Sequence, residues 1–380
     1  MSEKIPKGWK WVKLGEVVKI KHGYAFPGKN ITNQDTGKVL VTPGNFNIGG
    51  GFKSDKLKFY SGDYPKEYEL QGGEIIVVMT DLSKDADILG YSAKIPTDKK
   101  YKYLHNQRIG LVEIISSHID KDFIYWLMRT TDYHFFIVGG ASGTSVMHTS
   151  PDRINEYSFP LPPLPEQKAI AEVLSSIDDK IDLLHRQNKT LEEMAMTLFR
   201  QWFIEPTKDG LPEGWGEVRL GEFFPVITGK KDANFATDDG SYPFFTCSQK
   251  PLKAPNYSFD GNAILLAGNG DFNIKRYKGK FEAYQRTYVL IPYNSEYLNF
   301  LYLLMKFNLD EITGSFKGSV INYITKDMIT DFKFSLPKDR SSIKDKLLYF
   351  DRIYDKVDVN TSQIQTLEKL RDTLLPKLMS

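Results

Sequence analysis

Apolar residues along the chain follow two kinds of pattern. In the first, short apolar runs are bounded by glycine, as in "GGEIIVVM" beginning at Gly72 and "GNAILLAG" beginning at Gly261. Such runs predict buried strands. Residues 122–129 and 297–306 carry apolar positions at helical spacing, which predicts amphipathic helices. Together these segments predict globular parts of mixed α and β structure.

The second pattern is a long apolar stripe with a seven-residue repeat, and it occurs twice. Such a stripe is typical of helices that pair along a coiled-coil seam, and each stripe is an obvious partner for the other. An amphipathic helix that packs on its own domain would give a similar stripe, so this alternative stays open. The seam positions are Ile170, Ile177, Leu184, Leu191 and Leu198 in the first stripe, and Ile353, Leu367 and Leu374 in the second.

The chain repeats itself. "GWKWVKLGEVVKIKHG" at residues 8–23 recurs as "GWGEVRLGEFFPVITG" at residues 214–229. In the same order, "NQRIGLVEI" pairs with "YQRTYVLI", "IYWLMR" with "LYLLMK", and "YSFPLP" with "FKFSLP". Both copies end in one of the long stripes, so the protein consists of two copies of one unit, a globular domain followed by a long helix.

This duplication predicts the fold class and the domain boundaries. We expect an α+β fold with two similar mixed α/β domains, at residues 1–160 and 206–337. The long helices at 161–205 and 338–380 would pair as an antiparallel coiled coil, giving an internal pseudo-two-fold.

Prolines stiffen the entrance to the first long helix, at Pro160, Pro162, Pro163 and Pro165. Proline fixes φ and lacks the amide hydrogen, so these residues should stay outside the α ladder and set the angle between domain and helix. A helix of about 40 residues is roughly 55–60 Å long. Two diverged modules held at a fixed separation suit a linear partner with two sites, and DNA is the usual case.

Composition narrows the class of protein. The chain has 380 residues, 41% hydrophobic and 26% charged, as expected for a folded protein with two or three domains. Its formal net charge of +2 comes without a basic tail, so DNA would be held by local patches. No apolar run is long enough to span a membrane, and we expect a cytoplasmic protein. The single cysteine, Cys247, excludes an internal disulfide and is expected to be a buried bystander.

Catalytic motifs do not emerge from the sequence. We find no amine-methylating DPPY or NPPY motif, no phosphate-binding G-x-x-x-x-G-K-[ST] loop and no H-E-x-x-H metal site. "LAGNGD" lacks the third glycine of a dinucleotide site, and "PDRINEY" lacks the E-x-K expected of a nuclease. We therefore expect a chain that is not an enzyme and that holds no metal.

The repeated "GWKWVKLGE" and "GWGEVRLGE", the joint "YSFPLPPLPEQKAIAEVLSSIDDKID" and the "TLEEM" stretch carry a family resemblance. In these segments the chain resembles the specificity subunit of type I restriction-modification enzymes, over essentially its whole length. The resemblance implies two target recognition domains, each of which reads one half of a split target in double-stranded DNA, and helices that set the gap.

The resemblance also implies partners. Two methyltransferase (modification) subunits would dock on the helices, and restriction subunits would join through them. S-adenosylmethionine, ATP and Mg would then belong to those subunits, with no cofactor in this chain. The second joint reads "SLPKDRSSIK" in place of "PLPPLPEQK", so equal docking by both helices does not follow. A rival hypothesis is a two-headed coiled-coil adapter that holds two proteins apart and has no affinity for DNA.

The duplication also divides the candidate DNA contacts into residues that both copies share and residues that differ between them. Residues shared by the copies cannot distinguish two different half-sites, so the shared Gln-Arg pairs, with Arg108 and Arg286, should serve phosphate or the fold. Base contacts should lie in polar, glycine-hinged loops where the copies differ, because Lys, Arg, Asn and similar side chains match base edges. These candidates are Lys21, His22, Lys29, Asn30, Ser142, Thr144, Ser145 and His148 in the first copy, and Lys230, Lys231, Asn234, Asn269, Asn273, Lys275, Arg276, Lys278, Lys317, Ser319 and Asn322 in the second.

Overall fold

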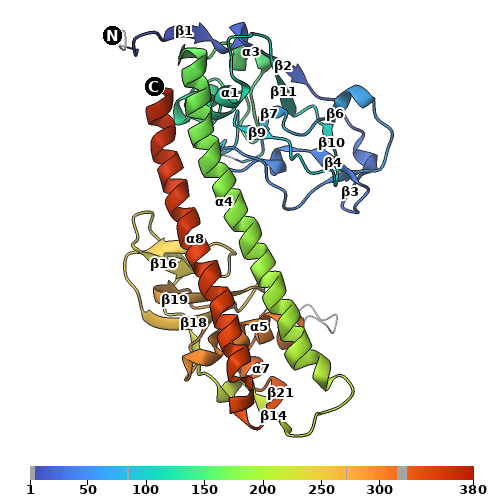
Figure 1. Cartoon of the computed structure of the whole chain (residues 1–380), viewed down its shortest axis with the longest axis vertical. Helices are drawn as coiled ribbons and strands as arrows, with labels where there is room; N and C mark the ends of the chain where they lie inside the picture. The colour runs from blue at the N-terminus through green and yellow to red at the C-terminus, as the bar shows by residue number, and fades with distance from the viewer. Residues whose placement is uncertain (1–4, 84, 271, 315–322) are drawn as a thin grey trace. The chain divides into compact units, whose positions relative to one another are not determined.

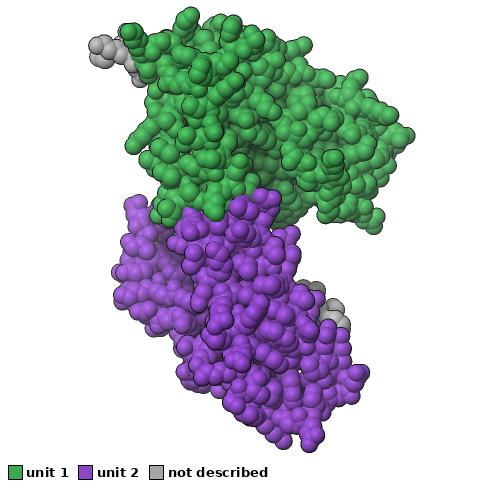
Figure 2. All heavy atoms as spheres, viewed as in Figure 1, with its two compact units in different colours: residues 1–182, 365–380 green, residues 183–364 purple. Residues whose placement is uncertain are grey.

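A computed structural model describes residues 5–83, 85–270, 272–314 and 323–380. The chain divides into two compact units, each built from one globular copy and parts of both long helices: unit 1 contains residues 1–182 and 365–380, and unit 2 contains residues 183–364 (Figure 2). The expected boundaries treat the helices as separate segments. Their buried faces instead complete the cores of the two units, so each helix is shared between them.

Unit 1 contains two main sheets and three short helices (Figure 1). The five-stranded sheet has the order β3 (Ile31–Thr32), β5 (Phe59–Tyr60), β4 (Lys38–Val41), β10 (Lys102–His105), β6 (Glu69–Leu70). The four-stranded sheet has the order β2 (Val18–His22), β11 (Ile109–Ile114), β7 (Ile75–Val78), β9 (Ser92–Lys94). Two further pairs are β1 (Lys10–Lys13) with β13 (Ser158–Leu161), and β8 (Thr80–Asp81) with β12 (Met147–His148). The helices are α1 (Lys121–Leu127), α2 (Thr131–Gly139) and α3 (Pro151–Asn155).

Unit 2 repeats this plan with one six-stranded sheet. Its order is β15 (Val226–Thr228), β20 (Thr287–Leu290), β18 (Phe259–Ala267), β19 (Ile274–Ala283), β16 (Tyr242–Phe245), β17 (Leu252–Ala254). The pair β14 (Trp215–Arg219) and β21 (Lys333–Pro337) corresponds to β1 and β13. Helices α5 (Leu298–Phe307), α6 (Leu309–Ile312) and α7 (Lys326–Thr330) follow the sheet. The strands and helices predicted from the glycine-bounded runs and the helical spacing are confirmed.

One strand explains why the copies differ in their number of sheets. In unit 2 the ten-residue β19 pairs antiparallel with β18 and then parallel with β16. In unit 1 the corresponding chain is broken into β9, which pairs with β7, and β10, which pairs parallel with β4. The continuous sheet of unit 2 is thus divided in unit 1 by the segment between residues 94 and 102.

The repeated Leu-Gly-Glu motif has the same structural role in both units. Leu14 and Leu220 are fully buried, and their amides donate to Tyr157 and Phe332 at 2.8 and 3.0 Å. The Glu16 carboxylate accepts the Lys13 amide at 3.0 Å, and Glu222 accepts that of Arg219 at 2.8 Å. The motif therefore fastens the first strand of each copy to the segment that leads into the long helix.

Gly23 and Gly229 recur because the backbone passes too close for a side chain. A Cβ atom on Gly23 would lie 2.2 Å from the Asn106 carbonyl oxygen, and one on Gly229 would lie 2.1 Å from that of Tyr284. Both distances are far below van der Waals contact. Each glycine allows the chain that follows the first sheet strand to pass against the turn that carries the Gln-Arg pair.

Helices α4 (Leu164–Phe199) and α8 (Lys344–Met379) carry the predicted seams (Figure 1). Ile170, Ile177, Leu184 and Ile353 are buried, while Leu191, Leu198, Leu367 and Leu374 are partly buried. In unit 1, α4 and α8 share a core that also contains α1; in unit 2 they share one with α5. The seam prediction and its alternative are therefore both correct in part, because the helices pack on each other and on the globular copies.

The proline-rich entrance differs from the sequence prediction in one detail. Pro160 lies in β13, but Pro165 is the second residue of α4. A helix tolerates proline in its first turn because the amides there have no intrahelical acceptor. Only Pro162 and Pro163 separate the strand from the helix.

A pair of asparagines, the buried Asn360 and the half-buried Asn188, interrupts the apolar seam in unit 2. Asn360, with no exposed surface, donates from its side chain to Asn188 Oδ1 at 2.9 Å. Asn188 Nδ2 lies 3.3 Å from Thr361 Oγ1. A polar residue in an apolar seam is satisfied only when it faces its partner, so this pair fixes the helix register. In unit 1 the corresponding contact between the helices is the hydrogen bond from Arg371 of α8 to Asp178 of α4, which agrees with the same antiparallel pairing.

Candidate functional site

Three separate segments of unit 1 meet at the end of β7. The Met79 amide donates to the Arg108 carbonyl at 2.9 Å, and the Thr149 amide donates to the Met79 carbonyl at 3.0 Å. Arg108 belongs to the tight turn between β10 and β11, and Thr149 follows β12. These hydrogen bonds hold the turn, the strand β8 and the strand β12 beside one another.

Unit 2 builds the same backbone frame from the matching segments. The Gly268 amide donates to the Arg286 carbonyl at 2.8 Å, and the Ile324 amide donates to the Gly268 carbonyl at 3.1 Å. Gly268 therefore corresponds to Met79, Arg286 to Arg108, and Ile324 to Thr149. We call this arrangement the three-segment frame, defined by these six residues. Its recurrence means that the side chains carried on it can be compared position by position.

In unit 1 the frame presents His148 and Arg108. Thr80 is 4% exposed, and its Oγ1 lies 3.1 Å from Nδ1 of the exposed His148. This contact orients the imidazole and leaves Nε2 available to a ligand. Ser142 exchanges two backbone hydrogen bonds with His148, which closes the exposed turn that contains Thr144 and Ser145.

In unit 2 the frame surrounds a hollow of ≈ 510 Å³. Asn269, Gln285, Arg286, Tyr288 and Tyr323 contribute to its lining. The Tyr288 hydroxyl donates to the Ile324 carbonyl at 2.6 Å and fixes one wall, whereas Tyr323 is 66% exposed. The walls thus combine two aromatic rings with amide and guanidinium groups, which are the groups that recognise nucleotides.

Cys247 is not the buried bystander predicted from the sequence. It is half-buried, and its thiol donates to Asn269 Oδ1 at 2.9 Å. The thiol therefore orients the Asn269 amide, as Thr80 orients His148 in unit 1. No periodicity or motif in the sequence indicated this role, because it depends on the strand β16, which ends just before Cys247 and places it beside the frame.

The two Gln-Arg pairs are exposed at equivalent turns. Among the described residues, the guanidinium groups of Arg108 and Arg286 have neither a hydrogen-bond acceptor nor an ion-pair partner within the chain. Of the two roles predicted for them, a contact within the domain therefore finds no support, and a contact with phosphate stays a prediction.

The remaining candidates are divided between the frame and more distant surface. Lys230 and Lys231 pass beside the Gln-Arg turn, since the Gln285 amide donates to the Lys231 carbonyl at 2.8 Å. Lys21 and His22 lie on β2, which pairs with β11 next to the corresponding turn. Lys29, Asn30 and Asn234 lie on short 3-10 turns. Lys317, Ser319 and Asn322 lie outside the described residues.

Four basic or polar candidates on and before β19 are paired with other groups of the chain; Asn273 is buried, whereas Lys278 stays exposed. The Arg276 side chain is 8% exposed, and its guanidinium bonds both carboxylate oxygens of Asp358 and the Tyr354 carbonyl on α8. Lys278 forms an ion pair with Asp355 at 2.8 Å. Asn273 donates to the Cys247 carbonyl at 2.7 Å and accepts from Lys275, whose pKa is lowered by burial. Arg276 and Lys278 therefore attach the sheet to the helix.

Replacing Arg276 with methionine should weaken the fold. The substitution keeps much of the apolar volume but removes the charge-assisted hydrogen bonds to Asp358, which are worth about 2 kcal/mol. Because Asp358 is 44% exposed, water can solvate the carboxylate that remains. Urea unfolding of the full chain measures the loss, with Arg286→Met as the control at an exposed site. Equal stability of the two variants would contradict the structural role of Arg276.

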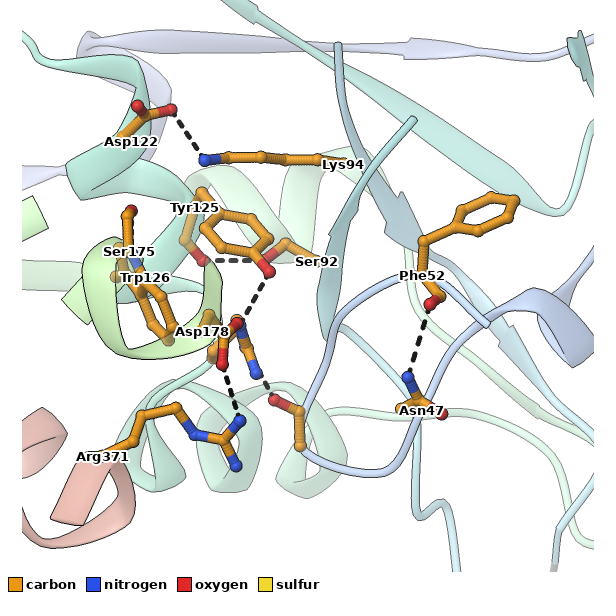
Figure 3. A network of polar contacts seen from close by, with 12 residues as sticks. Asn47, Phe52, Ser92, Lys94, Asp122, Tyr125, Trp126, Ser175, Asp178 and Arg371 are labelled. Carbon is orange, nitrogen blue, oxygen red and sulfur yellow. Dashed lines mark hydrogen bonds and ion pairs between the residues drawn. The ribbon is translucent and has the colours of Figure 1, made fainter. Parts of the chain in front are cut away.

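A second polar network fixes the helices to unit 1 (Figure 3). The Arg129 side chain, 4% exposed, donates to Gly49 O at 2.9 Å, Tyr125 OH at 2.7 Å and Asp178 Oδ2 at 2.7 Å. Arg371 of α8 donates to the other oxygen of Asp178 at 2.8 Å. Burial alone would raise the pKa of Asp178, but the two guanidinium groups lower it overall. The carboxylate therefore joins α4 and α8 to the turn between α1 and α2, which carries Arg129.

The Pro-Glu-Gln segment of the first joint also serves the fold. The Gln167 side chain donates to the His118 and Pro162 carbonyls at 3.0 and 2.9 Å and accepts the Asp120 amide at 2.9 Å. Glu166 accepts from the Trp9 indole at 3.2 Å. The absence of this motif from the second joint therefore changes how a helix is anchored to its domain.

Sequence reasoning missed Thr80 and Tyr323. Thr80 follows a run that was read only as a buried strand, although it aligns with Asn269 in the second copy. Tyr323 aligns with His148, and this difference marks a variable position on a common frame. The repeat alignment was thus the signal that could have identified both residues.

The described part of the chain lacks the features of two other classes of protein. No group of three or more His, Cys, Asp or Glu side chains is placed to hold a metal ion. None of the helices there combines the length and the apolar character required to cross a membrane.

Comparison with known proteins gives a consistent result. Residues 6–193 and 212–369 match the model of the type I restriction modification DNA specificity domain. The type I restriction enzyme EcoDI specificity subunit of Escherichia coli is 42% identical over 176 residues, covering 45% of this chain and 39% of that protein. The MjaIX specificity subunit of Methanocaldococcus jannaschii is 27% identical over 299 residues, or 68% of each chain. This chain therefore spans less than half of the first relative.

A solved structure shows the same fold over nearly the full length. The crystal structure of a type I restriction-modification system S subunit from M. genitalium covers 99% of this chain and 98% of its own, with a TM-score of 0.64 and 17% sequence identity. The two matched segments and this likeness coincide with the two copies recognised in the sequence.

Proposed function

The chain belongs to the type I restriction modification DNA specificity family, and from this premise we propose that it reads a bipartite, gapped target in double-stranded DNA with one globular copy per half-site. The observation that carries the proposal is the three-segment frame, which both units share while the exposed side chains on it differ. A common scaffold with diverged recognition groups suits two unlike half-sites. The chain is a specificity subunit and not a catalytic one.

Modification chemistry would then come from partners. We propose that two methyltransferase subunits dock on α4 and α8 and that restriction subunits join through them. Apolar side chains with 37–51% exposure support a docking role for the outer helix faces, namely Val173, Leu183, Met194, Leu348, Val359 and Leu370. S-adenosylmethionine, ATP and Mg would be bound by those partners, and the complex would act on chromosomal DNA in the cytoplasm.

The helices would set the length of the gap. Each of α4 and α8 runs without a break across the boundary between the units, at residues 182 and 364 respectively. The Asn188–Asn360 pair and the Asp178–Arg371 contact fix the register within each unit. Continuous helices of defined register are what a fixed number of unread base pairs between half-sites requires.

Base-resolution methylation sequencing tests the proposal. A host that expresses the partner subunits is compared with and without this gene. We expect one gapped, bipartite methylated motif to disappear when the gene is deleted, because the catalytic subunits would no longer select a sequence. An unchanged methylome, together with no DNA binding by the assembled complex, would favour the adapter hypothesis instead.

A further inference from the structure

The two units differ in chemistry at matched positions of one backbone frame. In unit 1, β8 pairs with β12 so that Thr80 lies opposite His148. In unit 2, Asn269 lies opposite Tyr323 in the same antiparallel sense. The first member of each pair, Thr80 or Asn269, directly follows the residue whose amide donates to the arginine carbonyl of the Gln-Arg turn. The pairs therefore occupy the same place beside a basic turn that both copies share, and they differ in their side chains.

We infer that His148, oriented by Thr80, and the pair Asn269–Tyr323 read bases in the two half-sites, and that Arg108 and Arg286 hold the adjacent phosphates. The inference rests on the proposed function and assigns its specificity to four residues. An arginine on the shared turn can bond phosphate in any sequence and so sets the register of the domain on the duplex. The diverged, base-reading side chains beside it then meet base edges that differ between half-sites.

Each pair has the preorganisation that base reading requires. In unit 1, Thr80 is buried and holds Nδ1 of His148, which leaves a single ring nitrogen, Nε2, to donate or accept. In unit 2, the Cys247 thiol holds Oδ1 of Asn269, whose amide can still both donate and accept. An asparagine amide suits the N6 and N7 edge of adenine, whereas one imidazole nitrogen offers one bond. The half-sites should therefore differ at the base pair that meets this position.

Other basic candidates of unit 2 are less suited to binding phosphate than the arginines of the Gln-Arg turns. Arg276 and Lys278 are paired with carboxylates of α8. The Lys230 and Lys231 ammonium groups lie over the Phe259 and Phe235 rings, at 5.1 and 4.5 Å from the ring centroids. Arg108 and Arg286, by contrast, are exposed without a described partner beside the variable pair. This position thus combines free charge with diverged, oriented polar groups in both units.

Exchange of the pairs between copies tests the inference. The variant Thr80→Asn/His148→Tyr gives unit 1 the groups of unit 2, and Asn269→Thr/Tyr323→His makes the reverse change. Each full-length variant is expressed with the partner subunits, and the methylated motif is sequenced. We expect a base change in one half-site only, in opposite halves for the two variants, with the gap and the other half-site retained. Methylation of the unaltered wild-type motif by both variants would overturn the inference.

Single substitutions at exposed positions cover the case in which an exchanged pair misfolds. His148→Ala and Tyr323→Ala should each lower discrimination at one base pair by roughly ten- to a hundredfold. Selection of bound duplexes by the purified complex, from pools with one half-site randomised, measures this ratio. Recovery of the wild-type half-site with undiminished discrimination would contradict the base-reading role.

The arginines provide a matched control with a different expected signature. Arg108→Gln and Arg286→Gln should weaken binding to all duplexes alike and reduce the slope of log affinity against log salt by about 1, without altering either half-site. A changed half-site would reverse the assigned division of roles. If the wild-type complex methylates no gapped motif, the proposed function itself fails, whereas a gapped motif that none of these variants alters refutes only the assignment of residues.

Discussion

Replacing Asp178 with asparagine should destabilise unit 1 by about 3–5 kcal/mol, the usual cost of removing one partner from a buried ion pair. The carboxylate accepts from Arg129 and Arg371 through separate oxygens. Asparagine is neutral and leaves the guanidinium of Arg129, only 4% exposed, without a counter-charge. Chemical unfolding of the full chain measures the effect, with the neighbouring, exposed Asp179→Asn as control. Similar losses for both variants would show that the network contributes little.

The same network gives the effect a defined pH dependence. The pKa of Asp178 is lowered in the folded protein, so the unfolded chain binds a proton more readily than the folded one as the pH falls. The stabilisation is therefore present above the unfolded pKa, near 4, and is lost as pH decreases through the lower folded value. The stability difference between wild type and Asp178→Asn should narrow below about pH 4. A difference that is constant down to strong acid would exclude a charge-based origin.

Insertion of one heptad into both long helices should lengthen the recognised gap by about 3 base pairs, since seven residues add roughly 10 Å of helix. The insertions belong after Asp182 in α4 and after Ile364 in α8, between the residues of unit 1 and those of unit 2, so that the contacts within each unit are preserved. A heptad keeps the apolar seam in phase. Methylation sequencing should show both half-sequences unchanged around a longer gap. A changed half-sequence would contradict the separation of reading from spacing.

A heptad inserted into α4 alone is the control for that experiment. It would displace the Asp178–Arg371 contact relative to the Asn188–Asn360 pair, so one of the two polar contacts must break. We expect a destabilised protein instead of a new gap. An equally stable protein with a lengthened gap would mean that α8 does not contribute to the spacing.

The features predictable from sequence were those with a period or a repeat. Ile170, Ile177 and Leu184 are buried as their seven-residue spacing predicts, and the duplicated segments correspond to two similar units. Even the closely packed Gly23 and Gly229 were visible as repeated residues, although the reason for the repeat required the backbone geometry. Pattern is informative here because strands and helices bury residues at fixed intervals.

The candidate site was less predictable because composition does not reveal the direction of a side chain. The basic cluster at residues 275–278 was interpreted as a loop, whereas it lies within the strand β19. Side chains alternate between the two faces of a strand, so Arg276 and Lys278 share the face that meets α8, while Lys275 contacts Asn273. The role of Cys247 likewise depends on how β16, the strand just before it, pairs with β19, and no local sequence pattern indicates this pairing.

Because each unit contains parts of both long helices, the order of synthesis on the ribosome constrains the order in which the two units can fold. Unit 1 contains residues 365–380, and its core includes Leu174 of α4 together with Leu375 and Met379 of α8. About 200 residues separate the two sides of this core, which at typical elongation rates is a delay of about 10–40 s. Throughout that interval the nascent chain carries an apolar helix face without its partner, a surface of the kind that promotes aggregation. Unit 2 is complete once residue 364 has emerged, so the unit that begins second is the first that can finish folding.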